Sequence, residues 1–291
     1  MSSMTAFNGI MIEAACRIAQ EVGARALVMG NDVAADFFRN QEQIPCPELV
    51  LLTRGAVQPE DQHLPGIILD MPDVNLTRVG QVKIAVTKGI AAGIFKKDDK
   101  IVCLSGVPKF GFVDSIFVID VGREFEILTL DDVSDITEGL QAEVFGELMN
   151  IALELAAQGR EGRRVGTIFI LGDHDQVLQL SRQMIINPFR GYPEEERNIL
   201  NPDLMETIRE FSALDGAFII KGNGAIVTAC RHLNTALESK DFPKGLGSRH
   251  IAAAGMTSVT DSVAVVLSES SGTVSVFKKG KMLVSIEKPI E

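Results

Sequence analysis

Apolar residues in the first part of the chain follow two alternating patterns, one typical of helices and the other typical of short buried strands. Positions at helical spacing predict helices over residues 9–22, 31–38 and 77–94. Uninterrupted apolar runs predict strands over residues 25–29, 49–52, 67–69, 100–104 and 115–121. Because strands and helices alternate, we expect a parallel or mostly parallel α/β sheet in this part of the chain.

The second part of the chain predicts another α/β domain. An amphipathic helix is expected over residues 138–157, and a second helix follows the glycines near residue 247. Strands are expected over residues 165–171, 217–221, 225–229, 262–268, 273–278 and 281–287. Gly222, Asn223 and Gly224 separate two of these runs in the manner of a hairpin turn, so some neighbouring strands are antiparallel. We place the boundary near residue 128, which gives domains 1–128 and 129–291.

Composition and charge exclude several classes of protein. The 291 residues are 46% hydrophobic, enough for real cores, and the net charge of −11 argues against broad binding to a nucleic-acid backbone. The chain has no Trp and one Tyr, which leaves few platforms for stacking bases. No apolar stretch reaches the roughly 18 residues of a membrane span, and the first residues lack the pattern of a signal peptide. We therefore expect a cytoplasmic protein with no nucleic acid and no membrane partner.

The four cysteines do not form a metal-binding pattern. They are scattered along the chain and none belongs to a CxxC pair, so a structural zinc site is not expected. Cys16 and Cys103 lie within apolar runs, and we expect both to be buried thiols, as in a reducing compartment.

The first candidate for chemistry is Asp215-Gly216-Ala217, directly before a predicted strand. An Asp at the edge of a strand is costly unless it caps a helix, turns the chain or binds something. Gly216 permits the close approach of a ligand to the backbone. An ordinary Asx turn is the alternative explanation of the same residues.

The second candidate is the segment Gly245–Ala254, in which Gly245, Leu246 and Gly247-Ser248-Arg249-His250 lead into an Ala-rich helix. Free backbone N–H groups and the helix dipole favour a phosphate at such a position. The Ser248 hydroxyl and the Arg249 guanidinium add donors that suit phosphate, and His250 can bind a divalent metal or a phosphate oxygen. The alternative is a capped helix with a solvated Arg and His.

The third candidate is the polar loop that contains Ser268 and Glu269, between two predicted strands. Glu269 can supply a carboxylate to a hard metal ion, and Ser268 can supply a hydroxyl to a phosphate. A plain hairpin turn is the alternative. Asp173-His174-Asp175 also has ligand-type side chains, but a helix N-terminus after the strand VGTIFIL explains the two aspartates more simply.

The three candidate segments occur in the order and approximate spacing of the diadenylate cyclase (DAC) family. That family has an Asp-Gly-Ala motif and, about thirty residues later, a Gly-Thr/Ser-Arg-His-Arg motif, followed by a loop with Ser-Glu. Asp215-Gly216-Ala217, Gly247-Ser248-Arg249-His250 and Ser268-Glu269 resemble these three motifs. The resemblance covers roughly residues 135–288, and it implies a mixed β-sheet flanked by helices.

The activity that this resemblance implies is the condensation of two ATP molecules into cyclic di-AMP, with release of two pyrophosphates. The chain carries one copy of each motif, so two face-to-face subunits of a homo-oligomer are implied. The implied catalytic residues are Asp215, Gly216, Ala217, Arg249 and His250. The residues implied to hold ATP are Leu233, Gly247, Ser248, Arg249 and Ser268. The implied ligands of Mn²⁺ or Mg²⁺ are Asp215, His250 and Glu269.

One position departs from the family pattern. Ile251 stands where many members carry the second Arg of the Arg-His-Arg motif, which changes the expected contacts to phosphate or to the neighbouring subunit. A receptor that binds ATP or cyclic di-AMP without making it is therefore an alternative.

The first 128 residues resemble, more faintly, the C-terminal domain of pyruvate kinases, through the early helix with strand RALVM and the segment Ile84–Val107. A second alternative to the cyclase is thus a scaffold in which this half binds a protein partner or a metabolite.

Overall fold

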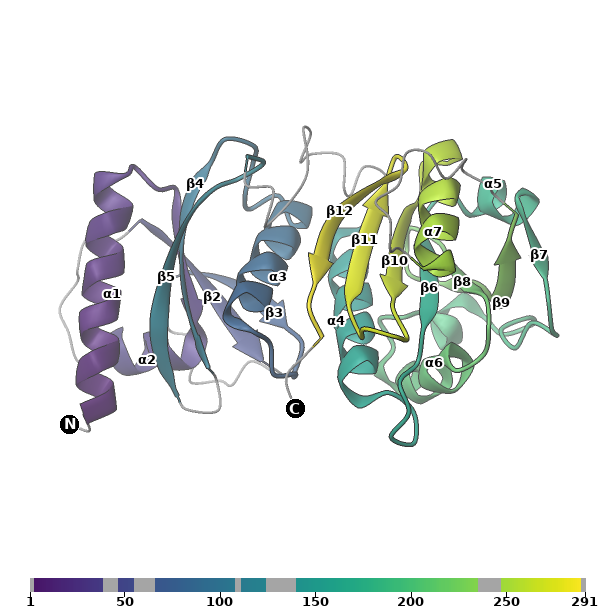
Figure 1. The fold of residues 1–291 in the computed structure, drawn as a ribbon, viewed down its shortest axis with the longest axis horizontal. Helices are drawn as coiled ribbons and strands as arrows, with labels where there is room; N and C mark the ends of the chain where they lie inside the picture. The colour runs from purple at the N-terminus through teal and green to yellow at the C-terminus, as the bar shows by residue number, and fades with distance from the viewer. Residues whose placement is uncertain are drawn as a thin grey trace. The chain divides into compact units, whose positions relative to one another are not determined.

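In the computed structural model the chain forms two β-sheets, each in its own unit (Figure 1). The units comprise Met1–Ser134 with Ile290–Glu291, and Asp135–Pro289. The structure describes residues 3–38, 47–54, 66–107, 111–123, 140–234 and 247–288. The predicted domain boundary near residue 128 lies outside these described residues and stays a prediction.

The N-terminal sheet is mostly parallel, as predicted. Its strand order is β3-β2-β1-β4-β5, in which the first four strands are parallel to their neighbours and β5 is antiparallel to β4. The strands are β1 (Ala26–Gly30), β2 (Glu48–Arg54), β3 (Ile67–Met71), β4 (Lys100–Val107) and β5 (Phe112–Asp120). The central strand β1 is almost completely buried, which explains its uninterrupted apolar sequence.

Helices cover both faces of this sheet (Figure 1). The helices are α1 (Ser3–Glu21), α2 (Asn31–Phe38) and α3 (Arg78–Ala91). The apolar sides of α1 and α2 share one core with alternate residues of β1 and β2, for example Ile12 and Val33 with Met29 and Leu51. Helix α3 begins after Thr77, whose hydroxyl accepts a hydrogen bond from the Gly80 N–H at 2.9 Å.

The C-terminal sheet is mixed, as expected, with strand order β12-β11-β10-β6-β8-β9-β7. Its strands are β6 (Thr167–Leu171), β7 (Ser181–Gln183), β8 (Ala217–Ile220), β9 (Ile226–Leu233), β10 (Val263–Leu267), β11 (Val274–Lys278) and β12 (Lys281–Ile286). Strands β6 and β8 are parallel, and the other neighbouring pairs in this order are antiparallel.

Two features of this sheet were not predicted. The edge strand β7 is too short and too polar to give an apolar pattern. The predicted strand ends at residue 229, because Arg231 interrupts the apolar run. In the structure, strand β9 continues four residues further, to Leu233. The Arg231 guanidinium donates to the carbonyls of Leu178 and Ser181 at 2.9 and 2.6 Å. This charged side chain is therefore accommodated within a strand, although its partners cannot be seen from the local sequence.

Helices also flank the second sheet, with α4 and α7 on opposite faces (Figure 1). The α-helices are α4 (Ala142–Gln158), α5 (His174–Gln179), α6 (Met205–Ser212) and α7 (Ser248–Val259). The short 3-10 helices are η4 (Glu194–Arg197) and η5 (Pro202–Leu204). The α7 residues Ala253, Ala254 and Met256 are buried against β6, β8 and β10, which fixes the helix on the sheet.

The cysteines correct one expectation. Cys16 is disulfide-bonded, so it is not the free thiol that its apolar surroundings predicted. Cys103 and Cys230 are free and buried, and burial raises the pKa of the Cys103 thiol to about 12. Disulfides are unusual in a reducing compartment, so the cysteine argument for a cytoplasmic location does not hold for Cys16. Within the described ranges, no helix has the length and apolar character needed to cross a membrane.

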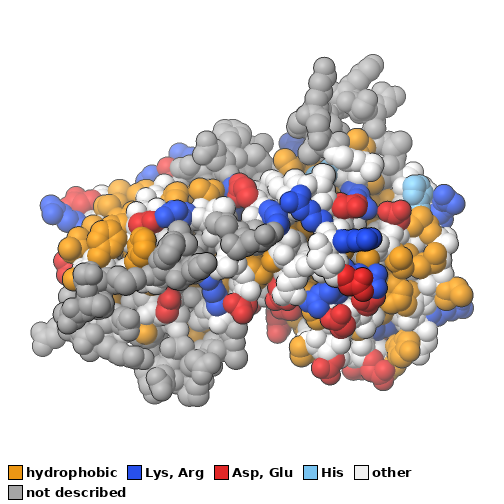
Figure 2. Space-filling view, turned by 60° about the horizontal axis from the view of Figure 1, so that its bottom comes forward, with side chains coloured by type: hydrophobic (Ala, Val, Ile, Leu, Met, Phe, Trp, Pro, Cys, Tyr) orange, Lys and Arg blue, Asp and Glu red, His pale blue; other side chains and the backbone are white. Residues whose placement is uncertain are grey.

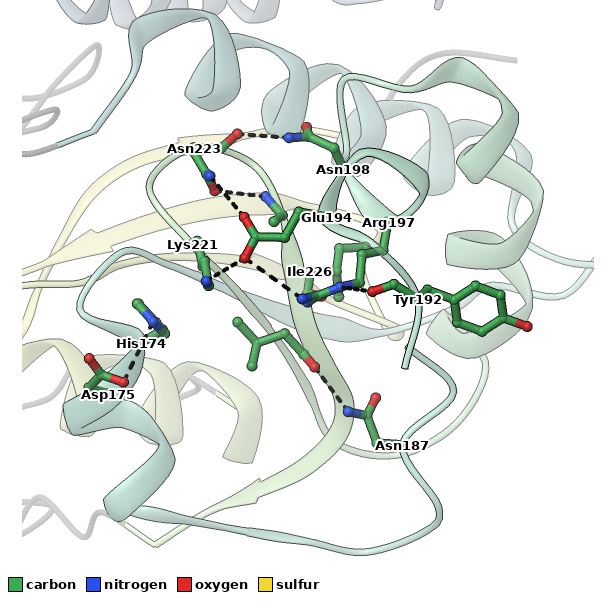
Figure 3. A network of polar contacts seen from close by, with 12 residues as sticks. His174, Asp175, Asn187, Tyr192, Glu194, Arg197, Asn198, Lys221, Asn223 and Ile226 are labelled. Carbon is green, nitrogen blue, oxygen red and sulfur yellow. Dashed lines mark hydrogen bonds and ion pairs between the residues drawn. The ribbon is translucent and has the colours of Figure 1, made fainter. Parts of the chain in front are cut away.

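A polar network holds the Pro- and Glu-rich segment before α6 onto the β8–β9 hairpin (Figure 3). The Glu194 carboxylate accepts hydrogen bonds from Lys221 Nζ at 2.5 Å and from Asn223 Nδ2 at 3.3 Å. Asn198 Nδ2 donates to the Asn223 carbonyl at 2.9 Å. The Lys221 hydrogen bond is the main cause that lowers the pKa of Glu194. Lys221 follows β8, so this network lies at the opposite end of that strand from Asp215.

We expect the Glu194 network to make stability depend on pH on the acid side. A lowered pKa in the folded state means that Glu194 stabilises the fold above the ordinary Glu pKa, and that this contribution is lost as pH falls through the folded value. Glu194→Gln should therefore lower Tm slightly at pH 7 and have no effect once the pH is below the folded pKa. Thermal unfolding followed from pH 7 to pH 3 measures this.

The matched control is Glu195→Gln, in the same 3-10 helix. Glu195 is exposed and makes none of the contacts found for Glu194, so its substitution should leave the pH profile unchanged. Equal profiles for the two variants would contradict the assigned role of Glu194.

Candidate active site

The three motif segments meet at one end of the C-terminal sheet. Strands β6 and β8 are parallel and both begin at this end, and β10 runs antiparallel to β6, with Leu267 opposite Thr167. Asp215 precedes β8 and Glu269 follows β10, so the sheet topology carries both carboxylates to the same edge. Helix α7 begins nearby, directly after Gly247.

Arg249 joins the two carboxylates. Its Nη2 lies 3.2 Å from Asp215 Oδ1, and its Nη1 lies 3.1 Å from Glu269 Oε2. The Arg249 side chain is 28% exposed, whereas the Asp215 side chain is 88% exposed and the Glu269 side chain 58%. The Arg249 guanidinium is therefore the most buried of the three groups, and the two carboxylates remain accessible to a ligand. Each of the three motifs contributes one member of this group.

Gly166 makes room for this group and was not identified from the sequence. A Cβ atom at Gly166 would lie 2.7 Å from Glu269 Cβ and 2.8 Å from Arg249 Nη1, both closer than real contacts. Gly166 comes directly before β6 and is buried. Its only sequence signal is a glycine at the start of the strand VGTIFIL, which has no specific meaning until the folded neighbours are known.

Gly216 and Ala217 shape the site from within the sheet. Gly216 has φ of +112°, and a Cβ there would lie 2.7 Å from the Cys230 carbonyl carbon on the neighbouring strand. Only glycine fits this backbone conformation and this close approach. Ala217 is fully buried in the core under α7. The close β8–β9 contact thus positions Asp215 just outside the sheet.

Leu233 offers its backbone rather than its side chain. The Leu233 side chain is buried in the core with Val177. Asn234 N–H donates to the Leu180 carbonyl at 2.9 Å, and Met184 N–H donates to the Cys230 carbonyl at 3.2 Å. Hydrogen-bonded pairs alternate in an antiparallel ladder. The N–H and C=O of Leu233 are therefore directed away from β7, toward the side on which β8 begins.

The start of α7 combines exposed and buried positions. Gly247 is the N-cap and no side chain caps the helix among the described residues, while Ser248 is exposed in the first turn. Gly245 and Leu246, which extend the motif, lie outside the described residues. His250 is 7% exposed, and its ring packs against Phe277 with centroids 5.9 Å apart. Burial lowers the pKa of His250, so the imidazole is neutral near pH 7.

Ser268 lies in the tight turn between β10 and β11. Its N–H donates to the Thr273 carbonyl at 3.0 Å, and its carbonyl accepts from the Gly272 N–H at 2.8 Å. The Ser268 hydroxyl is 3.3 Å from the Ser270 hydroxyl. The turn therefore sets the direction in which Glu269 leaves the sheet, so the hairpin explanation of this loop and the functional one are compatible.

The predicted metal ligands are only partly brought together. Within the described part of the chain, no group of three or more His, Cys, Asp or Glu side chains is placed to hold a metal ion. Asp215 and Glu269 share the Arg249 guanidinium, whereas His250 packs against Phe277. Two carboxylates at one edge suit an oxygen-preferring ion such as Mg²⁺ or Mn²⁺.

Charges of both signs are interspersed on the face of the C-terminal unit that Figure 2 shows. Acidic and basic side chains lie beside one another there rather than forming a continuous basic surface. This agrees with the acidic net charge and with a site for a small ligand rather than for a long polyanion.

Two family models match the chain. Residues 154–282 match the family described as "DisA bacterial checkpoint controller nucleotide-binding" (DAC), and residues 8–129 match the "Probable sensor domain DacZ_P". The match to the DAC model includes every motif residue discussed above.

Curated relatives agree with the family models. A diadenylate cyclase from Methanocaldococcus jannaschii is 39% identical over 191 residues, which are 65% of this chain and 60% of the relative. A diadenylate cyclase from Haloferax volcanii is 42% identical over 144 residues, which are 50% of this chain and 52% of the relative. The matched region thus spans somewhat more than half the length of these relatives.

Among solved structures, DacA from Staphylococcus aureus is 24% identical with a TM-score of 0.32, and the match covers 48% of this chain and 84% of that chain. Residues 154–282 are thus similar to the DAC family model, and the chain is similar to two archaeal diadenylate cyclases.

Proposed function

We propose that this protein is a diadenylate cyclase, which condenses two ATP molecules into cyclic di-AMP and releases two pyrophosphates. The observation that carries the proposal is the ion-paired group of Arg249, Asp215 and Glu269, in which each residue comes from a different motif. The two archaeal relatives, which are diadenylate cyclases, support the same activity. This group places a cation that can bind phosphate beside an exposed carboxylate that can accept a proton from a hydroxyl.

In the proposed reaction each ATP 3′-hydroxyl attacks the α-phosphorus of the other ATP. A new P–O bond forms, the bond to pyrophosphate breaks, and the hydroxyl proton is removed. Asp215 orients the attacking hydroxyl and accepts its proton, for which its exposed carboxylate is suited. Most of the acceleration comes from alignment and from stabilisation of charge on the phosphate.

We assign the triphosphate to the start of α7. The uncapped N–H groups there, the Ser248 hydroxyl and Arg249 all favour an anion. Ser268 is the proposed donor from the opposite loop, and the backbone of Leu233 is proposed to contact adenine. Leu233 is suited to this because its N–H and C=O are directed away from β7.

A divalent ion, Mn²⁺ or Mg²⁺, would neutralise phosphate charge when bound. We assign its protein ligands to Asp215 and Glu269, because their side chains converge on the same guanidinium. The imidazole of His250 is neutral, as a metal ligand must be. That His250 is the third ligand stays a prediction from the sequence.

Two subunits are needed for the symmetric reaction. The sequence has one Asp-Gly-Ala motif and one Gly-Ser-Arg-His motif, so one chain offers one ATP site. We therefore propose a homo-oligomer in which two DAC domains face each other across a two-fold axis. We also propose that the reaction takes place in the cytoplasm.

The receptor alternative rests on one residue. Ile251 replaces the second Arg of the family motif, and its half-buried side chain cannot supply a phosphate contact. If the protein binds ATP but forms no product, Ile251→Arg is the variant with which to seek turnover.

The activity is tested by incubating the protein with ATP and Mn²⁺ and identifying the product by mass. We expect cyclic di-AMP, and Asp215→Asn should lower the rate by about 100-fold or more because the carboxylate that accepts the proton is lost. ATP binding should remain in that variant. Near-normal product formation by Asp215→Asn would show that the catalytic assignment is wrong.

Arg249 should contribute mainly to ATP affinity. Arg249→Ala removes a charge-assisted contact and should weaken ATP binding about tenfold or more. Arg249→Lys keeps the charge but loses the planar fork, so intermediate affinity is expected. Calorimetric ATP titration of the three proteins measures this, and equal affinities would place the triphosphate elsewhere.

Gly166→Ala should reduce both activity and stability. The added Cβ would lie 2.7 Å from Glu269 Cβ, 2.8 Å from Arg249 Nη1 and 2.9 Å from the Glu269 backbone N, so the Arg249 side chain and the chain after β10 must both shift. We expect a clear loss of rate together with a lowered Tm. Gly9→Ala is the control, since a Cβ there meets the Phe37 ring at an ordinary 3.8 Å. Unchanged activity in Gly166→Ala would contradict this role.

A further inference from the structure

The N-terminal unit has the topology of sheets that bind ligands at the carboxyl ends of their strands. The chain moves from β1 to β2 to β3 on one side of β1, and β4 then lies on the other side. The order therefore reverses between β1 and β4, and open α/β sheets bind ligands at such a reversal. Asn31 follows the carboxyl end of β1, one of the two strands at the reversal, where α2 begins, and β2 and β3 continue the sheet from there.

Two buried polar side chains at this edge each carry an oxygen atom for which the described residues provide no hydrogen-bond partner. Asn31 is 6% exposed and Thr53 is 5% exposed. In the described part of the chain, the Asn31 Oδ1 and Thr53 Oγ1 atoms are buried and have no hydrogen-bond partner. A buried polar group without a partner destabilises a fold by about 1–3 kcal/mol, so native proteins seldom keep one without a reason.

The strand register places these two side chains beside each other. Gly30, the last residue of β1, pairs with Leu52, so Asn31 at the start of α2 and Thr53 on β2 each directly follow a residue of that pair. Alternation along β2 puts Thr53 on the face covered by α1 and α2, since Leu51 lies in that core two residues earlier. Thr53 in turn pairs with Asp70 on β3. Asn31, Thr53 and Asp70 thus lie at the carboxyl ends of three neighbouring strands, as a polar group that we call the β1–β3 row.

The charges around the β1–β3 row disfavour an anion. Lys88 Nζ already donates to the Asp70 carbonyl at 2.7 Å and contacts its carboxylate at 3.5 Å. Arg54 is exposed, but partial desolvation lowers the pKa of its guanidinium, and its interactions with Asp32 and Asp73 act in the opposite direction. Among the described residues named here, three carboxylates stand against two cations, which gives a slightly negative balance. The buried groups themselves are a neutral amide and a neutral hydroxyl.

We propose that the β1–β3 row binds a small, uncharged molecule that carries hydroxyl groups, of the polyol or monosaccharide class. A hydroxyl can donate to Asn31 Oδ1 and exchange a hydrogen bond with Thr53 Oγ1, which satisfies both atoms. The Asp70 carboxylate at the exposed end of the row accepts from a neighbouring hydroxyl. The proposal assigns a binding site to the unit that matches a probable sensor domain, and it does not depend on the nucleotide reaction.

The test is thermal unfolding of the full chain with glucose and with myo-inositol as probes, and with inorganic phosphate as the charged comparison. We expect one of the two uncharged probes to raise Tm in a saturable manner by roughly 2–4 °C, and phosphate to have no saturable effect. Thr53→Val keeps the volume and removes the hydroxyl. It should abolish the shift, and without a probe its Tm should equal or exceed that of the parent, because an unpaired buried hydroxyl is removed.

The matched control is Thr87→Val in α3. Thr87 is fully buried like Thr53, but its hydroxyl donates to the Lys83 carbonyl at 2.7 Å, so the probe-induced shift should persist. The proposal is overturned if neither uncharged probe gives a saturable shift, if phosphate alone does, or if Thr53→Val retains the shift. A Tm of Thr53→Val several degrees below the parent would also overturn it, since the hydroxyl would then already be satisfied in the unliganded fold.

Discussion

The guanidinium of Arg249, held between the carboxylates of Asp215 and Glu269, is the interaction on which the candidate site depends. Two carboxylates at one sheet edge repel each other, and a shared cation reduces that repulsion. The same cation is what a triphosphate requires. Because both carboxylates are exposed, the two ion pairs contribute little to the stability of the fold. Their role is to position three functional side chains before a ligand binds.

This placement follows from the topology of the mixed sheet. The parallel pair β6 and β8 and the antiparallel strand β10 bring two strand starts and one strand end to a single edge. Helix α7 is fixed on the same sheet by Ala253, Ala254 and Met256. Glycines then allow the close approaches that the geometry needs, at Gly166 under the Arg249 group and at Gly216 against β9. The opposite end of β8 is secured separately, by the Glu194 network.

Sequence patterns predicted those features that depend on local spacing or on a linear motif. The buried strands, the α3 helix and the hairpin at Asn223 were correctly predicted, because each has a local signature. Asp215, Arg249 and Glu269 were identified by motif, and the structure brings them together.

Other features depend on neighbours that are distant in sequence. Gly166 is required only because Glu269 and Arg249 pack over it, and β9 contains Arg231 only because carbonyls of α5 and β7 accept its hydrogen bonds. His250 was predicted beside the carboxylates, but the turn of α7 directs it toward Phe277. Helical spacing alone does not decide which of two adjacent residues, Arg249 or His250, faces a sheet edge.

The most direct test of the account is an experimental structure of the full chain with Mn²⁺ and an ATP analogue that has a non-reactive 3′-position. The account predicts the triphosphate at the start of α7 in contact with Arg249, the adenine beside the Leu233 backbone, and the 3′-position near Asp215 of a facing subunit. A nucleotide bound elsewhere on the C-terminal unit, with Arg249 still joined to Asp215 and Glu269, would contradict it.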